Sequence, residues 1–497
     1  MSQGWEIQGF LESHNGSLHV DGVDAVELAR EYGTPLFAYS EPRIRHNIAR
    51  LKKIGDAVGC GFKLCYAAKA MSTLGILRAV LDAECDLEVN SGGELLKALK
   101  AGFNGDQLNF NGISKEVWEI ELAIENSVYA IQVDSLYELS LIEETAKRLG
   151  KSANVSLRLV PEIESATHSG LQTALLTSKF GMMPDEAFGA FVKYKDSEHL
   201  NLNGLHLHVG SQNPSPDVYT QAFEEMFAAL LRIYRESGVR LKHINLGGGF
   251  PVNYLRDGLQ ASDFPDEQRE MFEASFEPAD AMNIAWASVT DKAEKEGVSD
   301  LLNAITLLLE PGRSIIADTA VCMTTVRNHK TRPIAQKSPP YQGGVAAASA
   351  DGVVLTAETS TAKDATQNAE VWLLTDAGFN ILLSMETYKW YYHLISAERA
   401  GEEHSFPYKV AGPLCDGGDV YFDVEGHRRL PDHRLLPDNV EPGEVLALLN
   451  CGAYSLAQAS QYNARYLPAV ILTKGDGKAE LIRTRDTFED LIGNDVF

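Results

Sequence analysis

Residues 61–102 read GFKLCYAAKAMSTLGILRAVLDAECDLEVNSGGELLKALKAG, and this stretch decides the fold. It holds two successive examples of one arrangement. A short apolar run of strand-forming residues, at 61–69 and again at 85–91, precedes a longer run with helical periodicity. Strands that alternate with helices in this way form βαβ units, which build parallel sheets. The stretch therefore predicts a parallel sheet covered by helices.

The same alternation continues to about residue 315. Six more short apolar runs follow: QLNFNG (107–112), YAIQVDS (129–135), NVSLRLVP (154–161), LNGLHLHVGS (202–211), HINLGGG (243–249) and ITLLLEPGRS (305–314). All but the last precede a helical or loop-plus-helical stretch. Eight such units over about 250 residues predict a parallel (β/α)8 TIM barrel. A doubly wound open sheet is the alternative on this pattern alone.

The pattern changes after about residue 316. Short apolar runs such as AEVWLLTDAGF and EVLALLNCGAY are bounded by Gly, Pro, Asn and Asp without regular helices between them, which predicts an antiparallel β-sandwich or barrel. Residues 328–367 are rich in Pro, Ser, Thr, Gly and Ala and are expected to form a long excursion or a mobile hairpin. The strand-like TPLFAYSE (34–41) can pair with this region. We therefore expect an N-terminal segment (1–42) that joins the β domain, a barrel (43–315) and the β domain itself (316–497).

Composition narrows the class of protein. The chain has 44 Lys and Arg against 69 Asp and Glu, a net charge of −25, which disfavours nucleic acid and anionic membrane surfaces as partners. No apolar run approaches the ~18 residues of a membrane span, and the N-terminus does not resemble a signal peptide. The six cysteines contain no CxxC, so neither a metal site nor a disulfide framework is expected. These features predict a protein of the reducing cytoplasm.

Two predicted strand ends carry charged residues suited to catalysis. Lys69 in YAAKA ends the first barrel strand, where a TIM barrel builds its active site, and a lysine near apolar walls can form a Schiff base. Glu310 and Arg313 in LEPGRS follow the last strand, where the acid can hold a pyridinium proton and the arginine can bind an anion. An ordinary surface lysine and an ion pair that closes the barrel are the structural alternatives.

Two further runs add polar groups. His206 and His208 in HLHVGSQ are expected on alternate faces of a strand, so that one can offer a flat ring at the barrel mouth. The glycines of NLGGGF (245–250) can present backbone N–H groups to a phosphate, although the run is not a GxGxxG motif. A structural histidine and a tight turn are the alternatives.

GPLCDGGD (412–419) places the thiol of Cys415 beside the carboxylate of Asp416 in a glycine-rich loop, which makes Cys415 the best candidate for a reactive cysteine. The alternative is a turn whose aspartates cap backbone N–H groups. A lysine, a strand-end glutamate, a histidine, a glycine-rich turn and this loop together match the needs of a pyridoxal phosphate site.

In these motifs the sequence resembles the fold-type III pyridoxal phosphate enzymes, the alanine racemase-like barrels, and within them the diaminopimelate and ornithine decarboxylase group. The resemblance runs from about Thr34 to the C-terminus and includes, in order, TPLFAYSE, YAAKA, LEVNSGGEL, FNGISK, VDSLYEL, SKFG, HVGSQ, LGGGF, EPGRS, TDAGFN, GPLCDGGD and CGAY. It implies a pyridoxal 5′-phosphate-dependent amino acid decarboxylase.

The resemblance also implies roles for individual residues. Lys69 would hold the cofactor as a Schiff base, His208 would stack on its ring, and Glu310 would bind the ring nitrogen. The residues implied to hold the phosphate are Ser211, Gly247, Gly248, Gly249, Gly312, Arg313 and Tyr454. Cys415 would be the acid that reprotonates Cα, and the Cys415 loop would come from the partner subunit. An obligate homodimer with two shared sites follows from this resemblance.

Departures from the group bear on the substrate. Diaminopimelate decarboxylases carry a CES-type loop and an arginine–proline pair for the distal carboxylate. This chain has Cys415–Asp416–Gly417 in that loop and Ser384–Met385 at that pair. Asp416 suits a distal ammonium, so Asp416, Arg313 and Ser384 are the expected substrate-binding residues. The C-terminal motifs look most like D-ornithine/D-lysine decarboxylases, which implies D-lysine or D-ornithine as substrate and cadaverine or putrescine as product.

Other functions stay open on the sequence. The alternative substrates are L-ornithine or L-lysine, then meso-diaminopimelate. A cofactor-free regulatory binding protein of the same fold is the remote alternative, which the presence of Lys69, Glu310 and Cys415 disfavours.

Overall fold

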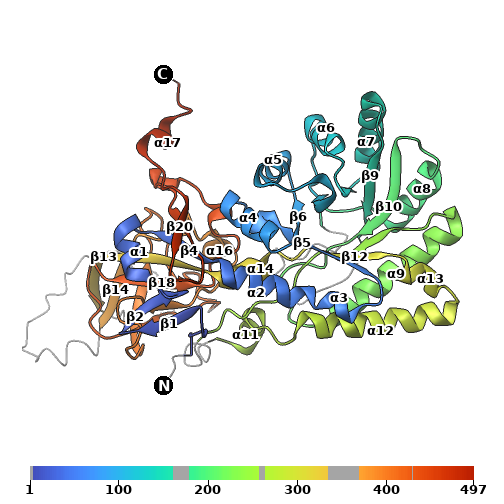
Figure 1. The fold of residues 1–497 in the computed structure, drawn as a ribbon. Coiled ribbons are helices and arrows are strands. Elements are labelled where there is room, and N and C mark those ends of the chain that lie inside the picture. Colours follow the sequence, from blue (N-terminus) through green and yellow to red (C-terminus); the bar gives the residue numbers. More distant parts are fainter. Residues whose placement is uncertain (1–3, 161–177, 257–263, 334–368, 428, 497) are drawn as a thin grey trace, which may run out of the picture.

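The computed structural model describes residues 4–160, 178–256, 264–333, 369–427 and 429–496. Within them the chain forms a closed barrel surrounded by helices and, beside it, a second part built mainly of strands. Figure 1 shows the two parts next to each other, with both chain termini on the side of the strand-rich part.

The barrel contains the eight predicted strands in sequence order. They are β5 (Gly61–Ala67), β6 (Asp86–Val89), β7 (Leu108–Phe110), β8 (Ala130–Val133), β9 (Ala153–Arg158), β10 (Leu200–His206), β11 (His243–Asn245) and β12 (Thr306–Leu309). Every neighbouring pair is parallel, and β12 pairs with β5 to close the ring. The predicted TIM barrel is therefore confirmed, and the open sheet is excluded because it would leave two free edges.

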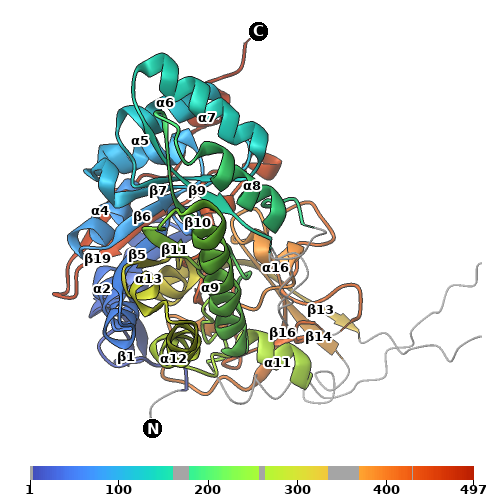
Figure 2. The ribbon, with the colours of Figure 1, turned by 90° about the vertical axis from the view of Figure 1, so that its right-hand side faces the viewer.

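Helices cover the barrel from outside, as Figure 2 shows for α7, α8, α9 and α12. Their bounds are α2 (Glu41–Lys52), α3 (Ile54–Ala57), α4 (Leu74–Asp82), α5 (Gly92–Ala101), α6 (Val117–Glu125), α7 (Leu136–Leu149), α8 (Pro184–Tyr194), α9 (Asp217–Ser237), α11 (Asp266–Phe272), α12 (Pro278–Glu296), α13 (Ser299–Asn303) and α14 (Arg313–Ile316). The starts of α5 and α7 are set locally, because Ser91 and Ser135 each accept a hydrogen bond from a first-turn backbone N–H. Gly102 and Gly150 end these two helices in the left-handed conformation.

The strand-rich part is a nine-stranded sheet rather than a purely antiparallel one. Its strands are β4 (Leu36–Ser40), β13 (Ala320–Pro333), β14 (Ala369–Thr375), β15 (Leu394–Ser396), β16 (Phe406–Ala411), β17 (Arg434–Leu436), β18 (Val445–Leu449), β19 (Ala469–Thr473) and β20 (Ala479–Arg483). Most pairs are antiparallel, but β14 pairs with β16 and β19 pairs with β4 in parallel. The antiparallel prediction is corrected at these two pairs, whose strands are joined by long connections instead of tight hairpins.

The N-terminus belongs to this sheet as well. β4 lies between β13 and β19, so a strand from before the barrel enters the sheet that follows it. Two elements precede β4 in the sequence. They are a small sheet of β1 (Leu11–His14), β2 (Ser17–Val20) and β3 (Val23–Asp24), and helix α1 (Ala25–Tyr32). Their buried side chains, such as Leu18 and Leu28, share a core with β4, β13 and β18. This contact ties the two ends of the sequence together.

Strand β13 runs to Pro333, and residues 328–333 pair antiparallel with β14. Of the two expectations for this region, a free excursion is therefore wrong for 328–333, whereas antiparallel pairing is the arrangement of a hairpin. The rest of that prediction, residues 334–367, lies outside the described residues. In the described part of the chain, no helix combines the length and the apolar character that crossing a membrane requires.

Candidate active site

A pocket of about 640 Å³ opens at the C-terminal ends of the barrel strands, where TIM barrels carry their active sites. Nine of the predicted site residues line it: Lys69, His208, Ser211, Gly249, Glu310, Gly312, Arg313, Ser384 and Tyr454. The barrel and the strand-rich part together bring into one space residues that the sequence spreads from 69 to 454.

Lys69 stands in a short 3-10 helix (Ala68–Ala70) directly after β5, with its side chain directed into the pocket. Its Nζ lies 3.9 Å from Oε1 of Glu88, a fully buried carboxylate on β6. Burial alone would lower the pKa of Lys69. Glu88 outweighs it, with help from Tyr454 and Glu310, so the pKa of Lys69 lies above its usual value. The amine is therefore held by a counter-charge before any ligand arrives.

Glu310, directly after β12, forms the polar floor of the pocket. Three asparagine side chains donate hydrogen bonds to its carboxylate: Asn109, Asn111 and Asn245. Burial first, and then the nearby charge of Glu88, raise the pKa of Glu310 to about 7. The Nε2 atom of His206 lies 3.5 Å from Oε2 of Glu310. This carboxyl group can therefore hold or release a proton near neutral pH.

His206 and His208 both line the pocket, so the prediction that they lie on alternate faces is wrong. Residues two apart in an extended chain point to the same side. Burial first, and then the positive charges of Lys69 and Arg158, keep the pKa of His208 well below its usual value. Its Nδ1 atom accepts a hydrogen bond from the backbone N–H of Gly248 at 3.3 Å. The neutral ring then carries its proton on Nε2.

The glycine turn after β11 packs too closely for any side chain. A Cβ on Gly248 would lie 2.5 Å from the carbonyl oxygen of Glu310. A Cβ on Gly249 would lie 2.5 Å from the carbonyl oxygen of Gly210, and its φ of +94° is one that glycine tolerates best. Of the three predicted glycines only Gly249 lines the pocket, while Gly247 and Gly248 form the turn beneath it.

Arg313, the first residue of α14, supplies a buried positive charge at the same mouth. Its Nε atom donates to Oγ of Ser211 at 3.1 Å, and its Nη1 atom donates to the hydroxyl of Tyr254 at 2.9 Å. The guanidinium lies 4.3 Å from the ring centre of Trp390 and 5.0 Å from that of Tyr454. Aromatic packing therefore fixes the orientation of this cation.

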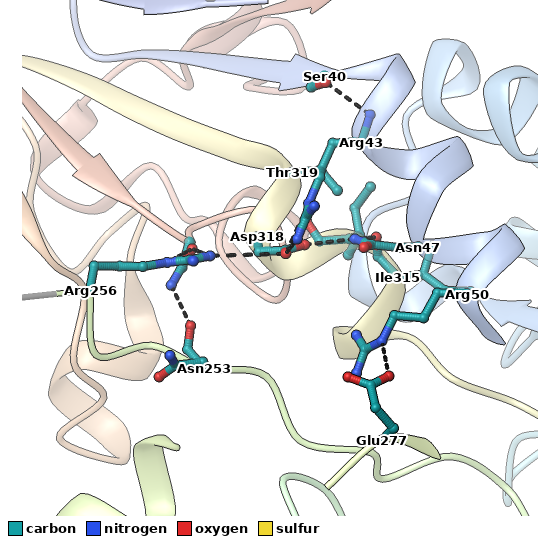
Figure 3. Close-up of polar contacts among 12 residues, drawn as sticks. Ser40, Arg43, Asn47, Arg50, Asn253, Arg256, Glu277, Ile315, Asp318 and Thr319 are labelled. Carbon is teal, nitrogen blue, oxygen red and sulfur yellow. Dashed lines mark hydrogen bonds and ion pairs between the residues drawn. The ribbon is translucent and has the colours of Figure 1, made fainter. Parts of the chain in front are cut away.

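Figure 3 shows a buried cluster of polar contacts around Asp318, with Arg43 and Arg256 directed toward it. Asp318 accepts two hydrogen bonds from Arg43, at 2.6 and 3.1 Å, and lies 3.9 Å from Arg256. Arg256 in turn donates to the side chain of Asn450 at 3.0 Å. Asn450 begins the turn that leads to Tyr454, so the cluster sets the position of that tyrosine.

Cys415 and Asp416 lie away from the pocket that this chain lines. Cys415 is the one exposed cysteine of the six. The Asp416 carboxylate accepts a hydrogen bond from the backbone N–H of Gly418 at 2.9 Å and lies 3.4 Å from the hydroxyl of Tyr462. Neither residue is among those that line the pocket together with Lys69.

The sequence reasoning missed three site residues. Glu88 and Asn111 connect the lysine to the floor, because Asn111 donates to Glu88 at 2.7 Å and to Glu310 at 3.0 Å. Arg158, at the end of β9, lines the pocket with its guanidinium 4.2 Å from the ring centre of Phe180. The sequence offered a signal for Glu88 and Arg158. Each is a charged residue inside or at the end of an apolar strand, Glu88 in LEVNS (87–91) and Arg158 in SLRLV (156–160).

Comparison with known proteins places this geometry in a family. The model of the pyridoxal-dependent decarboxylase pyridoxal-binding domain matches residues 44–317, and that of the C-terminal sheet domain of these enzymes matches residues 298–452. The chain belongs to the pyridoxal-dependent decarboxylases. Pyridoxal phosphate is thus its cofactor, and decarboxylation of a basic amino acid is its class of reaction.

Similar proteins in this family are diaminopimelate decarboxylases. The Methanocaldococcus jannaschii enzyme is 31% identical over 98% of this chain and 96% of its own length. The Staphylococcus aureus enzyme is 31% identical over 97% of this chain and 99% of its own. A crystal structure of the M. jannaschii enzyme matches with a TM-score of 0.78 at 30% identity, covering 98% of each chain. These names favour the alternative substrate of the sequence analysis over the D-ornithine/D-lysine assignment.

The residues of the pocket fit the family's cofactor. The amine of Lys69 shares the pocket with the carboxyl group of Glu310, whose pKa is raised to about 7, and the glycine turn leaves room that a Cβ would fill. A fixed guanidinium at the mouth suits a phosphate or carboxylate. These three features meet the needs of an aldehyde, a ring nitrogen and an anionic group.

Proposed function

We propose that this enzyme removes the carboxyl group from a D-configured carbon of a diamino acid. The observation that carries the proposal is that Lys69, His208, Glu310 and Arg313 line one pocket at the strand ends. When bound, pyridoxal phosphate supplies an electron-accepting ring for the electron pair left by the departing CO2.

The residues of the pocket divide the binding work. Lys69 would hold the cofactor covalently, and Glu88 would receive the free ammonium whenever substrate displaces that lysine. The neutral ring of His208, oriented by Gly248, would stack on the cofactor. The phosphate would lie against the glycine turn, Ser211, Gly312, Arg313 and Tyr454.

Glu310 favours decarboxylation over racemisation. A carboxylate opposite the ring nitrogen keeps a proton on that nitrogen, which strengthens the ring as an electron acceptor. Racemases of this fold instead pair the ring nitrogen of the cofactor with an arginine. A ring paired in that way accepts a full electron pair less readily. The asparagines around Glu310 hold its carboxyl group at a fixed place, so little reorganisation is needed during the reaction.

The active unit would be a homodimer with shared sites. Cys415 is exposed and does not line the pocket of its own chain, which supports the proposal that the acid that protonates Cα comes from the partner subunit. Asp416 beside it would face the far end of the substrate. A monomer would then bind cofactor but lack the proton donor.

Two substrates share the D-configured carbon and differ at the far end. The similar proteins' names favour meso-diaminopimelate, which ends in an ammonium and a carboxylate. Ser384 lines the pocket where the resemblance places an arginine for the distal carboxylate, which supports a substrate that ends in an ammonium alone, such as lysine or ornithine. A desolvated carboxylate without that partner would lose a charge-assisted hydrogen bond of about 1.5–3 kcal/mol.

One experiment separates the candidates. Holoenzyme is incubated with meso-diaminopimelate and with both enantiomers of lysine and ornithine, and CO2 release is measured. Turnover of meso-diaminopimelate alone would show that this enzyme has the substrate that the similar proteins' names give. Turnover of the D-enantiomers of lysine or ornithine would instead support the argument from Ser384 that the substrate lacks a distal carboxylate. Faster turnover of an L-enantiomer would contradict the proposed stereochemistry.

A further inference from the structure

A second large cleft, of about 660 Å³, opens on the strand-rich part of the molecule and shares no lining residue with the active-site pocket. Its walls come from the segment before β4, the adjoining strands β13 and β14, and three later loops. The residues that matter for its chemistry are Arg327, Asp376, Pro413, Arg465 and Arg485. The cleft is as roomy as the pocket that would take the cofactor.

The cleft is positively charged in a strongly acidic chain. Three arginines line it, but it contains one carboxylate, Asp376, which is taken by Arg327 at 2.6 Å. Arg465 donates to the carbonyl oxygen of Pro413 at 3.0 Å, and Arg485 donates to three carbonyl oxygens between residues 32 and 35. Among the residues that the structure describes, neither of these two guanidinium groups forms an ion pair. A positive cleft on a protein with a net charge of −25 concentrates small anions.

Arg485 is partly buried in the wall of the cleft. Burial lowers the pKa of Arg485, the charge of Asp376 opposes this, and Arg327 and Arg483 add smaller lowering effects. Its own hydrogen bonds are made by one nitrogen, Nη2, so its remaining donors are open to a ligand. Planar guanidinium groups with free donors recognise carboxylates and phosphates.

We propose that this cleft binds a small dianion with carboxylate or phosphate groups, held by Arg465 and Arg485. The site lies directly behind the loop of Cys415, because Gly412, Pro413 and Leu414 line the cleft. Arg465 holds that loop through the carbonyl of Pro413, so an anion that recruits Arg465 acts on the loop as well. Occupancy of the cleft is thereby coupled to the position of Cys415.

Calorimetry on the holoenzyme tests the binding, with the bound cofactor already filling the phosphate site of the active pocket. Sodium phosphate and sodium succinate are titrated separately at an ionic strength kept constant with sodium chloride. We expect saturable binding of at least one of them, and the one that binds identifies the ligand as phosphate-like or carboxylate-like. No saturable binding of either, or equal heat from chloride, would overturn the proposal.

The variant Arg465→Gln makes the test specific. This side chain is exposed, so the change leaves the fold intact, and we expect the Kd to rise about tenfold or more because a charge-assisted pair is lost. Arg235→Gln is the matched control, since Arg235 is an exposed arginine paired with Glu296 on the far helix layer. Unchanged affinity in Arg465→Gln, or an equal loss in the control, would place the anion elsewhere.

The alkylation rate of Cys415 by iodoacetamide tests the coupling. Cys415 is the exposed thiol, so it reports on its own loop. The saturating anion should change the rate at least about twofold in the parent enzyme and leave it unchanged in Arg465→Gln. A rate that ignores the anion in both proteins would overturn the coupling.

Discussion

At the scale of single residues, the site depends on how charges are placed inside the barrel. Glu88 and Glu310 are both buried, and Asn111 donates a hydrogen bond to each. Burial first, and then the nearby charge of Glu88, raise the pKa of Glu310 to about 7. Lys69 supplies the compensating positive charge.

The variant Lys69→Ala should abolish the covalent attachment of the cofactor. The purified protein should lose the visible absorbance band that borohydride removes from the parent enzyme, and CO2 release should cease. Lys179→Ala is the control, because Lys179 also lines the pocket but does not follow β5. A retained, borohydride-sensitive band in Lys69→Ala would show that another lysine holds the cofactor.

The stability of the cofactor-free protein should fall between about pH 4.5 and 7 through Glu310. Its carboxyl keeps a proton in the folded state up to about pH 7, whereas the unfolded chain loses it near the usual value of 4.5. The folded state thus binds more protons in this window, so the free energy of unfolding decreases as pH rises. Urea unfolding at pH 5 and 7.5 measures the loss, and Glu310→Gln should make it smaller. An unchanged pH dependence in that variant would contradict the raised pKa.

At the scale of elements, the turn after β11 and the short helix α14 are held by close packing. Gly248 touches the backbone at Glu310, and Arg313 at the start of α14 lies over Trp390. The parallel strands all end at the same edge of the barrel, so these loops meet there although they are not adjacent in the sequence. Close packing of the loops at this edge fixes the positions of the site residues.

The variant Gly248→Ala should weaken cofactor binding. Its Cβ would lie 2.5 Å from a backbone carbonyl oxygen, so the turn has to shift at a cost of about 1–3 kcal/mol. Fluorescence titration with pyridoxal phosphate should show a Kd raised by tenfold or more, and the melting temperature should fall. Gly189→Ala in α8 is the matched control, because a Cβ there meets nothing within 4 Å. Equal affinities in both variants would mean that the turn does not touch the cofactor.

At the scale of the whole molecule, the strand-rich part gathers both ends of the chain. β4 from the N-terminal region pairs with β13 and β19, and the cluster around Asp318 joins the barrel to the loop that carries Tyr454. The exposed loop of Cys415 lies on this part, and Cys415 is not among the residues that line the barrel pocket of its own chain. In the proposed homodimer, a second copy would supply this loop to the site.

Mixing two inactive variants tests the shared site. In a heterodimer of Lys69→Ala and Cys415→Ala, one site would combine an intact Lys69 with an intact Cys415 loop. Random reassociation of equal amounts should restore about a quarter of the sites. Size-exclusion chromatography with tagged subunits verifies the exchange. Absence of recovery after exchange would show that each site belongs to one chain.

The sequence by itself determined the barrel, because strand and helix periodicities are local properties that survive without knowledge of contacts. It also indicated that Lys69, Glu310 and Arg313 lie at the mouth of the barrel. A charged residue at a strand end is visible in the sequence, and TIM barrels carry their active sites at the C-terminal ends of their strands. Only the tertiary structure decided that His206 and His208 face one space and that β4, whose pairing with the β domain the sequence predicted, pairs in parallel with β19. It alone also revealed Glu88 beside Lys69. These are long-range contacts, and their geometry is set by packing between elements that no local pattern encodes.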